Sequence, residues 1–577
     1  MIKKFAPYLR NYKRATILGM TCSALEAVFE LLIPLVMSYI VDVGIQNRDV
    51  EYTIRMGIIM VLLAVVALIL GIGAARFAAV AGQGFGAELR EAQFKKIQSY
   101  SFKNIEKFST ASLITRLTSD VNALQMSVTI GMKILVRSPF MLVFALVIAV
   151  TISAKLALVF AVGIPILGIS LFLIISRVKP YFTKLQERTD DMNLTVQENL
   201  TGIRVVKSFV RQAFEKSKFN KSNEELMKAS ERAFSLTVLN MPIMQLVIFS
   251  TIIAILWFGG NMVSIGELEV GKLTSFLTYV NQILMSLMML SFIFIMLSRS
   301  IACGKRILEV LEEEPEIVDD SIHDYQVENG DVVFENVYFK YDEGSEEYNL
   351  TNINLNIKSG QTIGIIGGTG SAKSTLVQLI PRLYEAASGS VKVGGHDVRE
   401  YKLHTLRDAV AMVLQKNTLF SGTIAENLRW GDEKASDEEL RLASKAACAE
   451  EFIEKFQDSY DTYIEQGGVN VSGGQKQRLT IARALLKKPK ILILDDSTSA
   501  VDTATDAKIR EAFRKELKDT TKIIIAQRIS SIQDSDQIIV LDDGKIANIG
   551  NHEELMKDSE IYRDVYESQQ KGVAIDG

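Results

Sequence analysis

Six runs of about 20 mostly apolar residues fill the first half of the chain, and they restrict its possible folds more than any other feature. A run of this length is what an α-helix needs to cross the hydrocarbon core of a bilayer. Since a backbone in lipid must satisfy its own polar groups, the runs predict membrane-spanning helices. They lie at residues 15–41, 54–79, 135–153, 156–176, 238–258 and 277–297.

The charges between these runs predict their orientation. The N-terminal stretch MIKKFAPYLRNYKR and residues 88–116 are rich in Lys and Arg, whereas residues 41–52 are acidic on balance. Because basic connections stay on the cytoplasmic side, the N-terminus is predicted to be cytoplasmic. The two long polar connections, 80–134 and 177–237, then lie on that side as well. Their helical patterning predicts membrane helices that continue into the cytoplasm and turn there.

Two carboxylates interrupt the first apolar run. Glu26 and Glu30 are four residues apart and therefore share one face of a helix. An ionisable group near the bilayer centre costs at least about 2.5 kcal/mol, so a counter-ion is expected, and Arg76 and Arg137 are candidates. Two interpretations remain open. The carboxylates contact a cationic substrate or a proton, or they have a structural role, as a pair or as residues close enough to an interface to be hydrated. The structural role is the commoner one.

The second half of the chain has the composition of a soluble, charged protein. After an acidic stretch, short β-branched runs alternate with helical patterns, which predicts a parallel sheet covered by helices. The expected domains are a transmembrane domain at 1–308, a linker at 309–326 and an α/β domain at 327–577. With 64 basic and 68 acidic residues, the chain shows no basic excess typical of nucleic-acid binding, so no nucleic-acid partner is expected.

The stretch GGTGSAKST follows an apolar strand, QTIGIIG, and precedes a helical pattern, as a phosphate-binding loop does. The usual pattern has glycine directly before its lysine, and here Ala372 takes that place. We expect the methyl group to be tolerated if this residue keeps a negative φ. The residues expected to surround a nucleotide are Gly367, Gly368, Thr369, Gly370, Ser371, Ala372, Lys373, Ser374 and Thr375.

Specific roles follow from the chemistry of these side chains. Lys373 is expected to reach the β- and γ-phosphates, and Ser374 to hold Mg²⁺. The strand KILILDD places Asp495 as a second acidic group for the metal. Further upstream, an SGGQ segment begins a helix and predicts an anion site at the helix N-terminus. Its residues are Ser472, Gly473, Gly474 and Gln475.

In this order and spacing, the loop, the SGGQ segment and the LILDD strand resemble the ATP-binding cassette (ABC) exporters over nearly the full chain. The resemblance implies an α-helical six-helix transmembrane domain followed by an α/β P-loop nucleotide-binding domain. It also implies an ATPase coupled to transmembrane transport, with ATP and Mg²⁺ as cofactors. By matching motifs, Tyr341 stacks on adenine, and Gln415 senses Mg²⁺ and contacts the membrane domain.

The same resemblance assigns four further segments. EQGG at 465–468 is similar to the exporter X-loop, and SAVD at 499–502 to the D-loop. The stretches 109–121 and 199–212 match the two cytoplasmic coupling helices, which transmit motion between the domains.

Two positions depart from the family pattern. The glutamate that activates water is replaced by Asp496, and the histidine after the next strand by Gln527. Shortening the base by one methylene withdraws it by about 1 Å, which can lower a rate about a hundredfold. A glutamine can bond a phosphate but cannot titrate near neutral pH. The site is therefore expected to bind ATP and to hydrolyse it poorly.

In this family two cassettes pair head to tail, and each ATP lies between one P-loop and the partner's signature segment. The intact SGGQ can complete a partner's site, which favours a heterodimer with a second ABC half-transporter. The expected function is export of small amphiphilic or drug-like compounds by a multi-pass protein of the cell membrane, with a cytoplasmic nucleotide-binding domain. The alternatives are a lipid or peptide exporter and a non-transporting, ATP-sensing membrane regulator.

Overall fold

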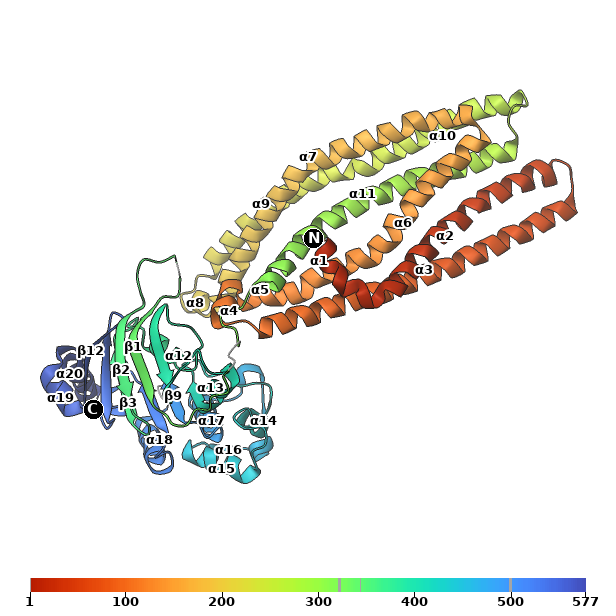
Figure 1. Ribbon diagram of the computed structural model, residues 1–577. Helices are drawn as coiled ribbons and strands as arrows, with labels where there is room; N and C mark the ends of the chain where they lie inside the picture. The colour runs from red at the N-terminus through yellow and green to blue at the C-terminus, as the bar shows by residue number, and fades with distance from the viewer. Residues whose placement is uncertain (1, 320–322, 343, 498–500, 577) are drawn as a thin grey trace. The chain divides into compact units, whose positions relative to one another are not determined.

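The computed structural model describes residues 2–319, 323–342, 344–497 and 501–576 (Figure 1). It contains two compact units, which we describe separately. The first comprises Met1–Gln98 with Thr110–Glu313, and the second comprises Ser99–Ser109 with Glu314–Gly577. The end of the first unit thus lies a few residues beyond the expected boundary at 308. A short piece of the first long polar connection, Ser99–Ser109, belongs to the second unit.

The first unit is entirely helical in its described part. Six of its described helices are long and apolar enough to cross a membrane, which confirms the predicted number. The segments are α1 (Ile2–Phe5), η1 (Ala6–Tyr12), α2 (Lys13–Tyr39), η2 (Ile40–Ile45), α3 (Val50–Gln98), α5 (Thr110–Thr115), η3 (Arg116–Asp120), α6 (Val121–Ile152), α7 (Ala154–Thr201), α8 (Ile203–Ser208), α9 (Gln212–Val238), α10 (Asn240–Ser264) and α11 (Val270–Glu312).

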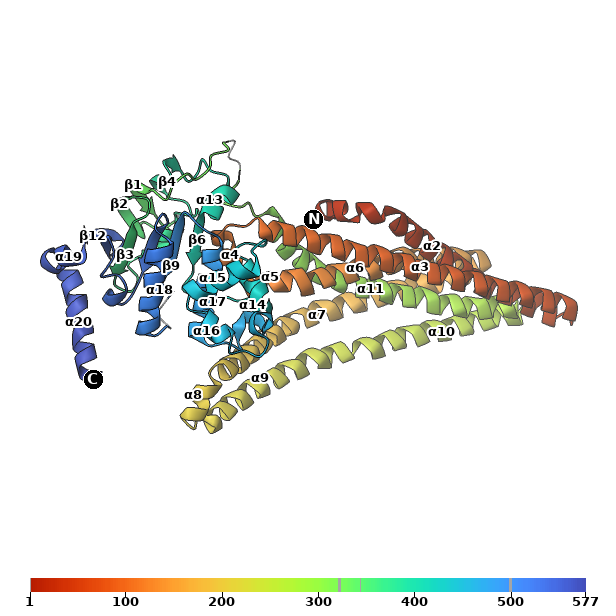
Figure 2. The same cartoon turned by 90° about the horizontal axis from the view of Figure 1, so that it is seen from below.

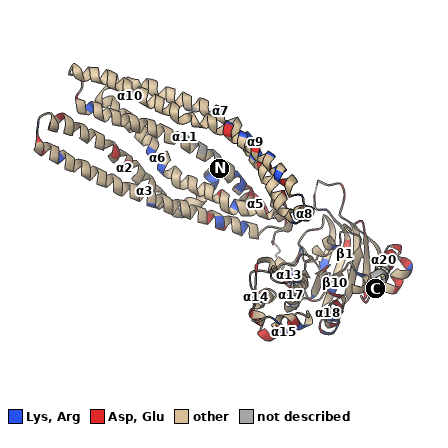
Figure 3. Cartoon of the chain, turned by 180° about the vertical axis from the view of Figure 1, so that it is seen from behind, with Lys and Arg blue, Asp and Glu red and all other residues tan. Residues whose placement is uncertain are grey.

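Several of these helices are longer than a membrane is thick. At 49 residues, α3 is about 70 Å long, whereas a hydrocarbon core is about 30 Å thick. Charged residues gather along α9 and are sparse along α10 (Figure 3). The distribution agrees with the prediction that the membrane helices extend into water at one end.

Buried aromatic contacts hold the apolar ends of these helices together. The rings of Phe160 on α7 and Phe276 on α11 are stacked, with their centroids 5.4 Å apart. The buried Tyr279 hydroxyl donates a 2.8 Å hydrogen bond to the Leu31 carbonyl of α2. Because Leu31 lies in α2 and Tyr279 lies in α11, this bond joins the first and last membrane helices.

The second unit contains the predicted parallel sheet. Among the described residues, six strands run in the order β12-β11-β3-β10-β9-β6, with β12 antiparallel and the others parallel. An antiparallel sheet, β2-β1-β4-β5, lies in the same unit. The strands are β1 (Val332–Phe339), β2 (Leu350–Ile357), β3 (Thr362–Gly367), β4 (Ser388–Val393), β5 (His396–Asp397), β6 (Val410–Val413), β7 (Gly422–Thr423), β8 (Tyr463–Ile464), β9 (Ile491–Asp495), β10 (Thr521–Ile525), β11 (Gln537–Asp542) and β12 (Lys545–Gly550).

Helices surround this sheet, and α19 and α20 stand beside its β12 edge (Figure 2). The helical segments are α4 (Phe102–Phe108), α12 (Lys373–Gln378), α13 (Leu403–Ala409), α14 (Ile424–Arg429), α15 (Asp437–Ala446), α16 (Glu450–Ile453), η4 (Ser459–Asp461), η5 (Gln466–Gly468), α17 (Gly473–Leu486), α18 (Thr503–Glu516), η6 (Ile529–Ser531), α19 (His552–Asp558) and α20 (Glu560–Asp576).

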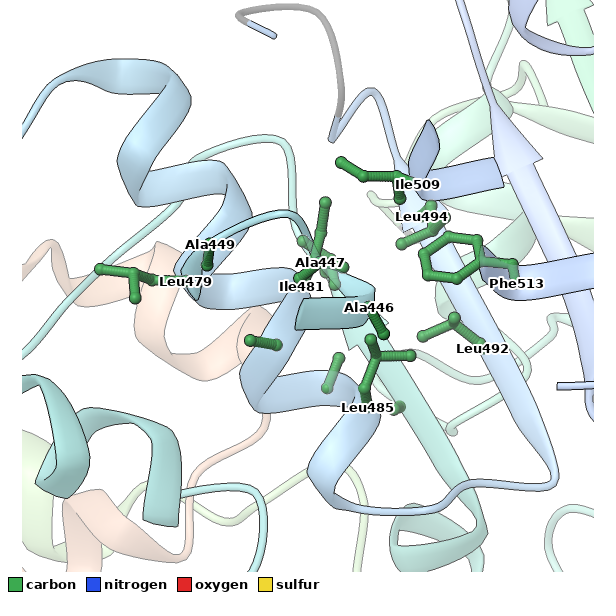
Figure 4. Close-up of a cluster of buried hydrophobic side chains, with 14 of the residues drawn as sticks. Ala446, Ala447, Ala449, Leu479, Ile481, Leu485, Leu492, Leu494, Ile509 and Phe513 are labelled. Carbon is green, nitrogen blue, oxygen red and sulfur yellow. The ribbon is translucent and has the colours of Figure 1, made fainter. Parts of the chain in front are cut away.

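The hydrophobic core of this unit holds the central strands of the parallel sheet in place, and the loops that follow these strands form one edge of the sheet. All residues of β9 are buried, as expected for a central parallel strand covered on both faces. Leu492 and Leu494 of β9 pack in one cluster with Leu485 of α17 and Phe513 of α18 (Figure 4). Since β10 lies between β3 and β9, the loops that follow these three strands meet at one edge of the sheet.

The first long polar connection differs from the expectation. Of the stretch expected as a coupling helix, residues 110–121 belong to the first unit, as α5, η3 and the start of α6. The part that belongs to the second unit contains α4, which begins after the helix cap Ser101. There the Tyr384 hydroxyl lies 2.9 Å from a carboxylate oxygen of Glu106, and its ring lies 6.0 Å from that of Phe102.

Candidate functional site

The phosphate-binding loop lies between β3 and α12, where the sequence places it. The Lys373 ammonium points back into this loop and donates hydrogen bonds to the carbonyls of Gly367 and Gly368, at 2.9 and 2.7 Å. Burial lowers the pKa of Lys373, and the nearby carboxylates of Asp495 and Asp496 oppose this shift. A cation inside a ring of backbone groups is suited to bind phosphate oxygens.

The alanine in this loop does not meet the condition under which we expected it to be harmless. Ala372 has φ +63° and ψ 27°, the left-handed conformation that glycine adopts freely. For an L-residue this conformation costs about 1 to 2 kcal/mol. The half-buried Ala372 packs against the apolar cluster beneath the loop, which offsets part of that cost. The loop keeps its form because its packing outweighs the strain.

Ser374 and Asp495 come together at the start of α12. The Ser374 hydroxyl donates a 2.9 Å hydrogen bond to Asp495 Oδ1. Burial raises the pKa of Asp495, and the bond from Ser374 opposes the shift. Magnesium prefers oxygen ligands and needs only one or two carboxylates beside phosphates and water. The pair therefore fits the predicted Mg²⁺ site.

Tyr341 follows β1 and flanks the loop. Its hydroxyl lies 2.9 Å from Thr375 Oγ1, and its ring meets that of Tyr384 edge-on, with centroids 5.2 Å apart. The aromatic side chain remains partly exposed. It is thus held beside the phosphate-binding loop with surface available for a base to stack on.

Asp496 and Gln527, which the sequence analysis expects in place of the usual base and histidine, are hydrogen-bonded to each other. Gln527, after β10, donates a 2.7 Å hydrogen bond from Nε2 to Asp496 Oδ2, after β9. The amide of Gln415 lies 3.5 Å from the same oxygen. Asp496 is buried with φ +47°, and burial raises the pKa of its carboxyl. One oxygen of this carboxylate is therefore held by an amide that cannot accept a proton near neutral pH.

Motif analysis missed a residue that holds this arrangement. Gln569 on α20 donates a 2.7 Å hydrogen bond to the Gln527 carbonyl and accepts one of 2.9 Å from the Ile529 backbone. The C-terminal helix thereby fixes the backbone on both sides of Arg528. The sequence offered no signal for it, because a glutamine on a polar helix is ordinary and lies 42 residues from its partner.

The SGGQ segment, which the sequence predicts to be an anion site, begins helix α17. Ser472 caps α17 and accepts a 3.3 Å hydrogen bond from the Gln475 amide, and Gln475 Oε1 accepts one of 2.8 Å from the Ser472 backbone. Among the described residues, no hydrogen bond or ion pair joins 472–475 to 367–375. Thr498, Ser499 and Ala500, in and beside the predicted D-loop, lie outside the described residues, whereas Asp502 caps α18.

Comparison with known proteins gives the same division of the chain. A family model described as the ABC transporter transmembrane region matches residues 16–287, and one described as ABC transporter matches residues 350–499. An uncharacterized ABC transporter ATP-binding protein of Bacillus subtilis, YfiB, is 37% identical over 568 residues, covering 98% of each chain. An uncharacterized ABC transporter ATP-binding protein of Mycobacterium tuberculosis is 36% identical, over 99% of this chain and 98% of its own length. The ATP-dependent lipid A-core flippase of Syntrophus aciditrophicus is 32% identical over 85% of this chain and 81% of its own length.

Proposed function

Since this chain belongs to the ABC transporters that join a transmembrane region to an ATP-binding domain, we propose that it is one subunit of a heterodimeric exporter. Membership in this family makes it an ATPase coupled to transport, with ATP and Mg²⁺ as cofactors. Our proposal adds that its own P-loop site binds ATP and hydrolyses it poorly. The proposed cargo is an amphiphilic or drug-like compound that leaves the cytoplasm.

The hydrogen bond between Gln527 and Asp496 is the observation that carries the slow-site proposal. A general base must reach the attacking water and accept its proton. Asp496 is shorter than glutamate, and its Oδ2 is engaged by the Gln527 amide. A displacement of about 1 Å at a reacting group can lower the rate about a hundredfold. Lys373, Ser374 and Asp495 retain the groups that hold phosphate and metal, so binding persists while hydrolysis is slow.

The heterodimer proposal follows from a difference between the P-loop site and the SGGQ segment of this chain. Ser472 to Gln475 keep their cap geometry, so this chain can complete a partner's site. A partner that supplies glutamate and histidine would then provide the rapid site, and a homodimer would contain two slow ones.

Exposed apolar surfaces support the presence of a partner. Val205, Phe209 and Val210 are exposed on α8 and just after it, in the second stretch expected to couple the domains. In the nucleotide-binding unit, Phe420 and Trp430 stack at 4.1 Å beside an open groove of about 320 Å³. Exposed apolar surfaces of this kind mark interaction sites. We propose that the partner's corresponding tip occupies this groove.

The proposed orientation places the N-terminus and the nucleotide-binding domain in the cytoplasm, with a transmembrane domain at 1–308, a linker at 309–326 and a nucleotide-binding domain at 327–577. The charged α9 and the basic N-terminal segment support placing these parts on the cytoplasmic side of the membrane. The exposed Met285, Met289 and Phe292 on one face of α11 support an amphiphilic cargo, since thioether side chains adapt to varied apolar surfaces.

A lipid cargo is the second candidate, because one relative is named a lipid A-core flippase. A vesicle assay separates the possibilities. The chain is reconstituted with the half-transporter that co-purifies with it, and ATP-dependent movement of a fluorescent cationic dye and of a fluorescent lipid is measured. We expect dye transport by the pair. Lipid movement alone would favour the second candidate, and movement of neither would favour a non-transporting regulator. Rapid ATP turnover by this chain alone would contradict the slow-site proposal.

A further inference from the structure

Three charged side chains meet within the membrane-spanning part of the first unit. Arg137 on α6 donates to Glu26 Oε1 at 2.9 Å and to Glu30 Oε2 at 2.5 Å, both on α2. Arg137 is thus the counter-ion that the sequence called for. Among the described residues, Arg76 forms no ion pair with either glutamate.

The charges in this cluster do not balance. With both carboxylates ionised, two negative charges share one guanidinium, which leaves one negative charge in excess. Glu26 is 9% exposed, and its Oε2 is buried with no hydrogen-bond partner among the described residues. Gly71 on α3 closes the cluster from another side, since a Cβ there would lie 3.0 Å from Glu26 Oε1. Unpaired charge is strongly disfavoured in such a place, so the cluster calls for one more positive charge.

Two aromatic rings flank the cluster on α6. Phe140 and Phe144 follow Arg137 by three and seven residues, and therefore lie on its face of the helix. Their rings are stacked with centroids 5.6 Å apart, and the residues are 39% and 41% exposed. Aromatic faces attract cations, most strongly where water is excluded. The same helix face thus offers apolar surface next to the excess negative charge.

We propose that Glu26 binds the positively charged group of an amphiphilic substrate, with Phe140 and Phe144 contacting its apolar part. Access comes from the side where the Glu30 and Arg137 side chains are 35% and 30% exposed. Arg137 bonds Glu26 Oε1, whereas Oε2 is buried and has no hydrogen-bond partner among the described residues, so the ligand cation reaches it only when neighbouring side chains move aside. This inference rests on the proposed export function, and it narrows the substrate class to lipophilic cations.

Direct binding tests the site without requiring transport. The full chain is placed in nanodiscs of zwitterionic phosphatidylcholine, and binding of radiolabelled tetraphenylphosphonium is measured against empty nanodiscs. Triphenylphosphine oxide serves as a neutral comparator. We expect Glu26→Gln to lower the affinity for the phosphonium at least about tenfold, equivalent to about 1.4 kcal/mol, and to leave the neutral compound unaffected.

Two further variants keep the test sharp. Glu51→Gln removes an exposed carboxylate outside the cluster and should bind both probes as the wild type does. Glu30→Gln also neutralises the cluster, while keeping the bond between Arg137 and Glu26, and should weaken phosphonium binding. Both cluster variants remove excess charge, so the thermal midpoint should not fall.

Unchanged phosphonium affinity in Glu26→Gln would overturn the inference, and so would an equal loss of both probes or no binding by the wild type. None of these results bears on ATP-dependent transport by the complex, which tests the proposed function separately.

Discussion

The loop after β3 and the loops after β9 and β10 lie at the same edge of one sheet, yet they differ in how well they suit their chemistry. The first leads into Lys373 and Ser374, which lie beside Asp495 at the end of β9, as the proposed phosphate and metal site requires. The other two place an aspartate and a glutamine where they bond each other. Binding and hydrolysis use different groups, so one can be retained while the other is weakened.

The largest expected effect is a loss of nucleotide binding at the loop after β3. Lys373→Ala should abolish tight ATP binding, because removing a partly buried cation from its anionic partner costs about 2 to 5 kcal/mol. Nucleotide affinity is measured by equilibrium binding to the full chain. Lys392→Ala, which removes a partly exposed lysine paired with Glu335, is the matched control and should bind as the wild type does. Equal affinity in both variants would exclude Lys373 from the site.

The next largest expected effect is a gain in ATP hydrolysis at the same site. Asp496→Glu combined with Gln527→His should raise the rate of single-turnover ATP hydrolysis at this site about a hundredfold. The longer carboxylate extends about 1 Å further, and the hydrogen bond from the Gln527 amide is removed. ATP affinity should change little. Asp496→Glu alone should give a smaller gain, since Gln527 can still bond the longer carboxylate. A double variant as slow as the wild type would contradict the proposed cause.

A smaller effect concerns the C-terminal helix. Gln569→Ala removes two hydrogen bonds to the backbone around Gln527, each worth about 0.5 to 1.5 kcal/mol. Amide exchange at Ile529 should accelerate, and the rate of hydrolysis should shift without a matching change in ATP affinity. Gln570→Ala, at the exposed neighbouring position, is the control. If both variants exchange alike, α20 does not position the loop.

The smallest effect tests the strain in the binding loop. Ala372→Gly relieves a left-handed conformation but loses a packed methyl group, worth about 0.8 kcal/mol. The free energy of unfolding should therefore change by less than about 1 kcal/mol. Ala372→Val should lower it by more than 1 kcal/mol, since β-branched residues tolerate positive φ poorly. Chemical denaturation checks both, and a Val variant as stable as the wild type would disprove the strain.

The features that depend on a local sequence pattern could be predicted from the sequence. Six apolar runs became six long helices, and the alternation of strands and helices became a parallel sheet, because each signal lies within one element. The positions of Lys373, Ser374 and Asp495 followed from motifs tied to strand ends. The need for a counter-ion at Glu26 and Glu30 was also visible, although the choice of Arg137 over Arg76 required the packing of α2 against α6.

What the sequence did not predict depends on distant contacts. The positive φ of Ala372 results from closing the loop over its core, and the bond between Gln527 and Asp496 joins residues 31 apart in the chain. The placement of α4 was missed because the pattern at 109–121 is more strongly helical. The capping pair Ser101 and Asn104 was the signal that could have located it.

The most direct test of the account follows the fate of ATP bound to this chain. The full chain is loaded with radiolabelled ATP and Mg²⁺, unbound nucleotide is removed, and the bound species are separated over time. We predict that the nucleotide stays bound as ATP in the wild type and is converted to ADP much faster in the Asp496→Glu, Gln527→His double variant. Conversion within a second in the wild type, as expected for a kcat of about 10 s⁻¹, would contradict the central claim.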